Sequence, residues 1–343
     1  EVIPTPSGKK RPIARLAADV EVTKPDQRTA SVEGQISGEE KASQPALIDP
    51  SSAPGLVAAE NGPEDYTKWP IPEAVLFVTG DQHGYIEPCG CTGLEKQKGG
   101  VARRMTFLKK LRERGLGVVP VDAGNQIRRI GQQATIKFEK SADALSQMDY
   151  QCVGLGPGDM RLSATDLISV TYADSPDDAM FVSGNVVLID PEFLPTHKLV
   201  KKGELKIGLS SILDPESLEA PVSTDVTIAP IKESAAKVLG EMNGAGADFR
   251  VLTFFGEEDV AQQLMKDVPG YDLIIVSGGY GEPTYRPVDI EGSETKMIVT
   301  GNKGMFVGLV GLYQNGPIKY ARVPLTHEYE DAPEMRKLMA DYQ

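Results

Sequence analysis

The sequence has no uninterrupted run of about 18 apolar residues, which is the length that a membrane-spanning helix needs. We therefore expect no transmembrane segment. Only three cysteines are present, Cys89, Cys91 and Cys152, and so small and odd a number does not describe a disulfide framework. No C-x-x-C-H motif occurs, so the chain itself carries no covalently attached c-type haem.

Histidine and positive charge are also scarce. His83, His197 and His327 are the whole histidine supply, which limits any metal centre built on imidazole. There are 36 Lys and Arg against 49 Asp and Glu, and the formal net charge is -13. Nucleic acid is therefore not expected as a partner, because binding to its phosphates depends on clustered Lys and Arg that displace counterions.

Residues 1–70 lack any aromatic side chain before Tyr66 and contain nine of the 25 prolines. They include the Ser-, Glu- and Ala-rich stretch SVEGQISGEEKASQPALIDPSSAPG. Such a composition cannot bury enough apolar surface to offset the entropy of ordering. We expect residues 1–70 to be an extended linker or a segment that wraps on a partner, followed by one domain over residues 71–343.

From about residue 73 onward, short apolar runs alternate with amphipathic helical patterns. Strands are predicted at AVLFVTG (74–80), LGVVPVDAG (116–124) and YQCVGLG (150–156), with helices between them at 99–115 and 134–149. This order is typical of an α/β fold with a parallel sheet. The turns TGDQHG, DAGNQ and LGPGD should then lie at the carboxyl edge of that sheet, where active sites of α/β proteins gather.

The middle of the chain is expected to be more β-rich, with FVSGNVVLID (181–190) and a hairpin over 197–213. The second half is expected to start with the helix at 231–242 and to repeat the strand, helix, strand arrangement. Helices at 231–242 and 257–268 then alternate with strands at 249–256 and 271–279. Residues 296–325 are expected to form an antiparallel closing set of strands, and 332–342 a terminal helix.

Two motifs carry a resemblance to a known family. Asp81, Gln82, His83 and Gly84 match D-x-H-G after the first strand, and residues 99–104 match G-G-x-A-R-R at the start of the next helix. Over residues 75–327 the chain resembles the metallophosphoesterase (calcineurin-like) domain of the 5'-nucleotidase and 2',3'-cyclic phosphodiesterase family. The resemblance implies an αββα sandwich and a site with two divalent metals, held by Asp, Asn and neutral His side chains.

Most of the expected ligands are replaced. The family's D-A-G-D motif is matched by Asp122, Ala123, Gly124 and Asn125, so its last Asp is replaced by Asn. Pro157 and Gly158 stand where the family has Asn and the His that protonates the leaving group. Phe254 occupies the place of a ligand His, and the later G-H-x-H reads Gly278, Gly279, Tyr280, Gly281. The resemblance therefore implies a scaffold that has lost its hydrolase site.

A residual one-metal site remains as the alternative, with candidate ligands Asp81, His83, Asp122, Asn125 and Asp159. Otherwise we expect no cofactor. If Asp81 and Asp122 face an emptied cleft, an unpaired buried charge would be costly and a cation should take the place of the metal. The candidate cations are Arg103, Arg104, Arg128 and Arg129.

The three cysteines leave several redox interpretations open. Cys89 and Cys91 can form a strained disulfide within C-G-C, contribute to a soft-metal site that would need more thiolates, or bridge to Cys152. Cys152 precedes the end of its strand and should lie deeper than the loop. We expect Cys152 to be a small buried apolar side chain.

Two functions follow from the resemblance. The first is a catalytically inactive structural or interaction subunit in the periplasm or cell envelope of a bacterium. Domains with a similar HGYIEPCGC opening occur with multihaem c-type cytochromes, which implies such a cytochrome as a protein partner. The alternative is a metal-dependent hydrolase with an altered single-metal site, similar to 5'-nucleotidases or to thiosulfohydrolases of the same superfamily. The scarcity of histidine favours the first.

Overall fold

The computed structural model describes residues 63–90, 93–279, 282–314 and 316–340. They belong to one compact unit, Ala58–Gln343. Residues 1–62, which make up most of the predicted extended segment, lie outside the described ranges. The first described residues already pack on the domain: the ring of Tyr66, in the 3-10 turn Tyr66–Lys68, makes an edge contact with Phe107.

The first sheet has the strand order β13-β12-β1-β2-β3. Strands β1 (Ala74–Thr79), β2 (Val118–Asp122) and β3 (Cys152–Val153) run parallel. Strand β12 (Phe306–Leu312) pairs antiparallel with β1, and β13 (Lys319–Pro324) pairs antiparallel with β12. Every residue of β1 and β2 is buried. This explains why each strand is apolar up to its last residue, Thr79 or Asp122, because a parallel sheet is covered on both faces.

The second sheet has the order β10-β11-β9-β8-β6-β5. Strands β6 (Leu205–Leu213), β8 (Phe249–Phe255), β9 (Leu273–Ser277) and β11 (Lys296–Val299) are parallel. Strands β5 (Lys198–Lys202) and β10 (Val288–Asp289) pair antiparallel at the two ends. The predicted hairpin over 197–213 is thereby confirmed as β5 and β6. The prediction that 296–325 forms one antiparallel set is wrong for β11, which joins β9 in parallel.

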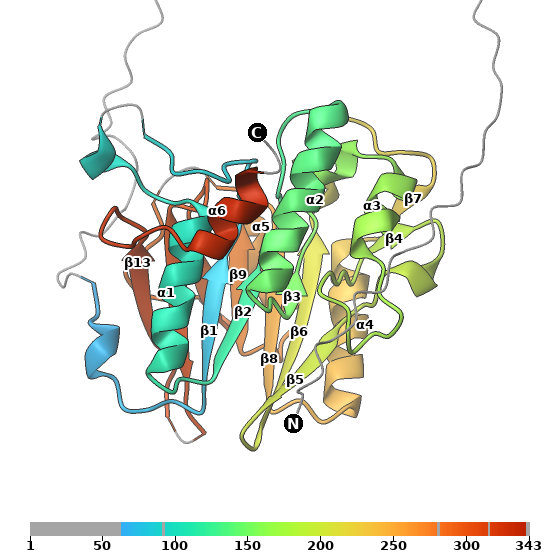
Figure 1. The fold of residues 1–343 in the computed structure, drawn as a ribbon. Helices are drawn as coiled ribbons and strands as arrows, with labels where there is room; N and C mark the ends of the chain where they lie inside the picture. The colour runs from blue at the N-terminus through green and yellow to red at the C-terminus, as the bar shows by residue number, and fades with distance from the viewer. Residues whose placement is uncertain (1–62, 91–92, 280–281, 315, 341–343) are drawn as a thin grey trace, which may run out of the picture. The chain divides into compact units, whose positions relative to one another are not determined.

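Helices cover the outer face of each sheet (Figure 1). Helices α1 (Val101–Glu113), α2 (Gln132–Gln147), α3 (Ala164–Thr171) and α6 (Pro333–Ala340) contribute to the core on the first sheet. Helices α4 (Ile231–Gly244) and α5 (Glu258–Asp267) pack on the second. A third core, which includes Leu76, Val121, Val251 and Ile275, joins the two sheets. The predicted αββα sandwich is confirmed.

A small third sheet pairs β4 (Val186–Leu188) antiparallel with β7 (Val226–Ile228). Short 3-10 turns also occur at Leu94–Lys96, Asp159–Arg161, Pro191–Phe193 and Pro215–Ser217. Within the described part of the chain, no helix has the length and apolar character needed to cross a membrane.

Candidate functional site

The loops after β1, β2 and β3 meet at the carboxyl edge of the first sheet, as the sequence predicts. Backbone hydrogen bonds tie the first two together: Asp81 N donates to Gly124 O at 2.8 Å, and His83 N donates to Asn125 O at 3.0 Å. Asp81, His83 and Asn125 all have positive φ, of 50°, 52° and 66°. Left-handed backbone at three side chains in one place is uncommon and marks this edge as the candidate site.

Asp81 is buried, and a single one of its oxygens has two close neighbours. Asn125 Nδ2 donates to Asp81 Oδ1 at 2.6 Å, and His83 Nε2 lies 2.9 Å from the same atom. The amide oxygen of Asn125 is used elsewhere, because it accepts from Gly158 N at 2.8 Å. The hydrogen-bond network therefore turns the nitrogen of Asn125, which cannot bind a metal, toward Asp81.

Asp122, at the end of β2, is fully buried and surrounded by donors. Its Oδ1 accepts from Gly124 N at 2.9 Å and from Gln126 Nε2 at 2.7 Å, while its Oδ2 accepts from Thr79 Oγ1. Burial raises the pKa of Asp122, and the guanidinium of Arg104 and these donors oppose that rise.

Arg104 is the cation that the sequence predicts beside the buried carboxylates. Its side chain is 1% exposed, its Nη1 lies 4.0 Å from Asp122 Oδ2, and its Nη2 donates to Gln82 Oε1. Nε and Nη1 have no hydrogen-bond partner among the described residues. The other candidates lie elsewhere: Arg103 donates to Gln97 O, and Arg128 and Arg129 are exposed.

Tyr150 completes the buried polar network around Asp122. Its hydroxyl lies 2.9 Å from Thr79 Oγ1. Burial raises the pKa of Tyr150 to about 12, against the opposing effect of Arg104, so the phenol stays neutral near pH 7 and can serve as a hydrogen-bond donor.

Asp159 holds the third loop against the second. Its carboxylate accepts from three backbone nitrogens, Asn125 N at 2.9 Å, Ile127 N at 3.1 Å and Gly156 N at 2.9 Å. Burial raises the pKa of Asp159 to about 7, although these donors favour the charged form. The geometry gives Asp159 the role of a loop clamp.

Close backbone packing fills the place where the family has its catalytic His. A Cβ on Gly158 would lie 1.8 Å from Ile127 O and 2.7 Å from Asn125 Oδ1, and a Cβ on Gly156 would lie 2.4 Å from the Asn125 Cβ. No side chain fits at either position without a shift of the loops. A proton donor at position 158 is therefore excluded by sterics as well as by residue type.

Phe254 is the residue that the resemblance equates with a ligand His. Phe254 is fully buried among α4 and α5 residues, on the outer face of the second sheet. Side chains alternate along a strand, so its neighbour Phe255 faces the other way. Phe255 is 5% exposed, and its ring is 3.0 Å from the Cβ position of Gly278. Tyr280 and Gly281 of the same motif lie outside the described residues.

The remaining candidates are distributed over the domain. Cys89 and Cys152 are free thiols, and Cys91 is outside the described residues. Cys152 is fully buried in the core between the sheets, and burial raises its pKa, which confirms it as a buried apolar side chain. His197 pairs with Glu241 at 3.3 Å, and His327 is exposed in a turn, so neither joins the site.

The donor set does not fit a metal centre of the family type. The carboxylates of Asp81, Asp122 and Asp159 and the amide oxygen of Asn125 all accept from protein donors. No group of three His, Cys, Asp or Glu side chains in the described ranges has an arrangement that could hold a metal ion. A bridging ligand is also missing, because the Asn125 amide is neutral and its oxygen is occupied.

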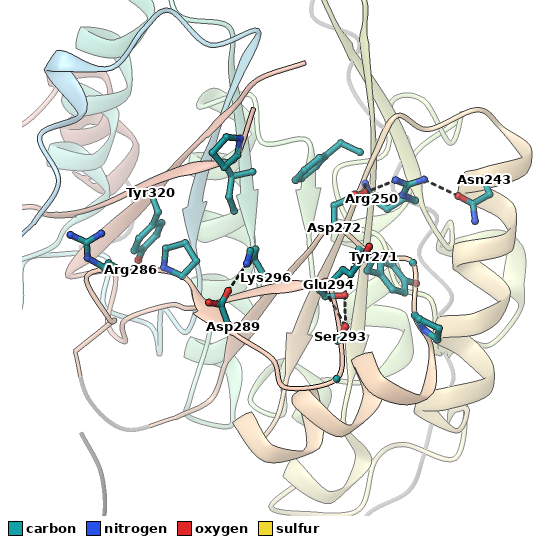
Figure 2. Close-up of a pocket in the computed structure, with 18 of the residues that line it drawn as sticks. Asn243, Arg250, Tyr271, Asp272, Arg286, Asp289, Ser293, Glu294, Lys296 and Tyr320 are labelled. Atoms are coloured by element: carbon teal, nitrogen blue, oxygen red, sulfur yellow. Dashed lines mark hydrogen bonds and ion pairs between the residues drawn. The ribbon is translucent and has the colours of Figure 1, made fainter. Parts of the chain in front are cut away.

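A cavity lies elsewhere in the domain. It has a volume of about 1030 Å³ and is lined by residues at the starts of β8, β9 and β11 (Figure 2). The end of β9 adjoins the candidate site, since a Cβ on Gly80 would lie 2.9 Å from Ser277 Oγ, so the cavity is at the opposite edge. Its cations are largely paired: Arg250 with Asp272 at 2.8 Å and Lys296 with Asp289.

Comparison with known proteins supports the fold and nothing finer. No family model and no curated protein matches the sequence. A 5'-nucleotidase precursor from Thermus thermophilus superimposes with a TM-score of 0.65 at 20% identity, over 78% of this chain and 58% of that one. The sulfate thiohydrolase SoxB from the same organism gives 0.66 at 13% identity, over 80% and 60% of the two chains.

A calcineurin-like phosphoesterase, YfkN from Bacillus subtilis, gives a TM-score of 0.59 at 16% identity, over 78% of this chain and 96% of that one. The chain thus spans less than two thirds of the nucleotidase and thiohydrolase structures. With its order of strands and its two-sheet core, this chain has a metallophosphoesterase-like fold, similar to those of 5'-nucleotidases, SoxB and calcineurin-like phosphoesterases.

Proposed function

We propose that the chain is a catalytically inactive metallophosphoesterase-like protein that serves as a structural or interaction subunit. The observation that carries the proposal is the pairing of Asn125 with Asp81, in which an amide nitrogen occupies the position of a bridging carboxylate and donates at 2.6 Å. The Asp81 oxygen that would face a metal is thereby satisfied within the protein.

The chemistry of the family depends on elements that these residues do not supply. Two metals polarise the phosphoryl group and generate a hydroxide, a shared carboxylate neutralises both cations, and a general acid protonates the leaving group. Asn125 cannot neutralise two cations, and Gly158 has no side chain. Because each interaction acts in the transition state, their losses compound.

A metal-dependent hydrolase with a single-metal site is the competing function. It is favoured by the similarity in fold to a 5'-nucleotidase and to SoxB and by the presence of Asp81 and His83. Its substrate would be a phosphate ester, or a sulfur compound as the name of the thiohydrolase indicates. It requires His83 and Asp81 to turn from each other toward a shared ligand.

The two functions are separated by metal analysis and an activity screen on the full chain. We expect no hydrolysis of nucleoside monophosphates or bis-aryl phosphates with manganese, zinc or cobalt, and less than one metal per chain after dialysis. One or more bound metals per chain, or turnover that disappears in an Asp81→Ala variant, would favour the hydrolase instead.

The compartment and partner in this proposal rest on the resemblance of HGYIEPCGC (83–91) to domains that accompany multihaem c-type cytochromes. We place the protein in the periplasm or cell envelope of a bacterium, with residues 1–70 extended along such a partner. Affinity capture from native membranes followed by haem staining tests this assignment. Capture of no haem protein by the full chain, under conditions that preserve known cytochrome complexes, would remove the cytochrome from the proposal.

A further inference from the structure

The negative charge of the chain is concentrated in two stretches. From Leu162 to His197 the sequence contains no Lys or Arg but six Asp and Glu, and from Asp214 to Pro230 it contains no Lys or Arg but four. These two stretches therefore hold ten acidic residues and no Lys or Arg, in a chain whose formal net charge is -13.

The two stretches fold together into one lobe, which we call the acidic lobe (162–197 and 214–230). It contains α3, β4, the turn Pro191–Phe193, the turn Pro215–Ser217 and β7. The pairing of β4 with β7 joins the stretches, with Leu188 opposite Val226, and Ile189 N donates to Asp225 O at 2.8 Å. In Figure 1 these elements lie side by side along one flank of the domain.

The carboxylates of this lobe are largely left to solvent. Six are exposed and belong to no ion pair among the described residues: Asp174, Asp177, Asp178, Asp190, Glu192 and Asp225. Two cations flank the lobe: Arg161 pairs with Glu219 at 3.3 Å, and Lys198, which is half-buried, donates to Ala179 O at 2.8 Å and interacts with Asp177 and Asp178. Because Arg161 is engaged by Glu219 and one ammonium group cannot neutralise six carboxylates, the lobe generates a strongly negative potential.

Apolar side chains stand exposed among these charges. Tyr172 is 51% exposed and Ile189 is 57% exposed. The Tyr172 ring makes an edge contact with Phe193, with centroids 6.0 Å apart, and Phe193 is in the turn that follows Ile189. Ile189 has a φ of 58°, which is strained for a β-branched residue. Exposed apolar residues rimmed by charge are typical of protein interfaces.

We propose that the acidic lobe is a docking surface for a protein that presents a Lys- or Arg-rich face around an apolar contact. The unpaired carboxylates would supply attraction and orientation, and Tyr172, Ile189 and Phe193 the desolvated centre. Like charge disfavours a second copy of this chain as the occupant, and the exposed apolar side chains distinguish the lobe from a simple cation site. The inference rests on the proposed function only in treating the chain as an interaction subunit.

The test uses the full chain and two folded probes of one fold and opposite charge, hen lysozyme (basic) and α-lactalbumin (acidic), titrated between about 20 and 200 mM salt. The lobe-charge variant carries Asp174→Asn, Asp177→Asn and Glu192→Gln. The matched control removes three exposed, unpaired carboxylates elsewhere, with Glu139→Gln, Glu233→Gln and Glu291→Gln. An apolar variant carries Tyr172→Ser and Ile189→Asn, since Asn tolerates positive φ.

Lysozyme should bind the wild type, and α-lactalbumin should not. The lobe-charge variant should bind lysozyme at least tenfold more weakly at low salt and with a smaller salt dependence, whereas the control should change less than twofold. The apolar variant should lose about threefold or more at every salt concentration with the same salt dependence, because it removes contact area and no charge.

Three results would overturn the proposal. Equal weakening in the lobe-charge and control variants, or no lysozyme binding, would mean that the lobe is no distinct surface. Unchanged lysozyme binding by the apolar variant would show that Tyr172 and Ile189 are not part of the interface. A calcium-dependent rise in melting temperature that only the lobe-charge variant loses, without lysozyme binding, would assign the carboxylates to a cation. If the full chain has no hydrolase activity and does not bind lysozyme, the docking surface is refuted and the proposed function is not. If the full chain hydrolyses a substrate and still binds lysozyme through the acidic lobe, the proposed function is refuted and the docking surface is not.

Discussion

Asn125 donates its side-chain nitrogen to Asp81 Oδ1 at 2.6 Å while its side-chain oxygen accepts from Gly158 N at 2.8 Å. One residue thus links the loops after β1, β2 and β3. A carboxylate at position 125 could accept from Gly158 N, but it could not donate to Asp81. Asn125 therefore has a structural role that requires an amide.

Asn125→Asp should destabilise the protein, because it replaces a donor by a second buried carboxylate beside Asp81. We expect the free energy of unfolding to fall by roughly 1 to 3 kcal/mol at pH 7. Urea titrations of the wild type and the variant measure the difference.

The matched control is Asn243→Asp. Asn243 is exposed and its Oδ1 accepts from Arg250 Nη1 at 3.3 Å, so the change should stay within about 0.5 kcal/mol. A manganese-dependent rise in melting temperature for Asn125→Asp would contradict the structural role, because it would show that one carboxylate rebuilds a metal site.

Arg104 should be required for stability through Asp122. Arg104→Met would leave a fully buried carboxylate without its cation, which costs about 3 to 5 kcal/mol. The loss of the guanidinium raises the pKa of Asp122 further above its unfolded value. Because a raised folded pKa means that the unfolded state releases its proton first, the destabilisation should grow as the pH rises.

Adding Asp122→Asn to Arg104→Met should recover much of the lost stability, since it removes the buried charge. Arg112→Met on the same helix serves as control: Arg112 is partly exposed, donates to Met148 O and pairs with the exposed Asp149 at 3.6 Å, and we expect a loss of about 1 kcal/mol or less. Denaturation curves of the wild type and the three variants measure these differences. No recovery in the double variant would show that Arg104 acts through packing alone.

The elements that the sequence predicts well are those whose apolar pattern is local. A strand that is buried on both faces has a continuous apolar sequence, as at 74–80. A helix that is buried on one face has apolar residues three or four positions apart, as at 134–149, 231–242 and 257–268. The sequence of β11 does not indicate that it pairs in parallel with β9, since the topology of the whole sheet decides which strand a short apolar strand pairs with.

The candidate site shows the same limit. Motif matching brings Asp81, His83, Asp122, Asn125 and Asp159 to one edge, and the structure places them there. It cannot say which amide atom of Asn125 faces Asp81, or that Arg104 reaches Asp122 from α1. Nor can it say which face of β8 Phe254 occupies, which the structure shows to be the face that packs on α4 and α5.

Asp159 should make stability depend on pH. Burial raises its pKa to about 7 in the folded state, from its ordinary value of 3.8. The unfolded state therefore ionises first, so the contribution of Asp159 is fully present below about pH 4, declines as the pH rises, and is lost above about pH 7. Asp159→Asn cannot ionise, so the stability of the wild type relative to this variant should decline over that range by an amount on the order of a few kcal/mol. A constant difference between pH 4 and 7 would mean that the three backbone donors keep the pKa low.

Gly158 should be required for steric reasons alone. Its backbone has φ -64° and ψ -41°, a conformation open to any residue, but a Cβ would lie 1.8 Å from Ile127 O. Gly158→Ala and Gly158→His should therefore lose about 3 kcal/mol or more of stability, and Gly158→His should gain no hydrolase activity. Gly240, within α4, has no atom within 4 Å of its Cβ position, so Gly240→Ala should stabilise the protein by about 0.5 to 1 kcal/mol. Equal stability of Gly158→Ala and Gly240→Ala would show that the loops yield easily, and that the position of the lost acid remains open to a side chain.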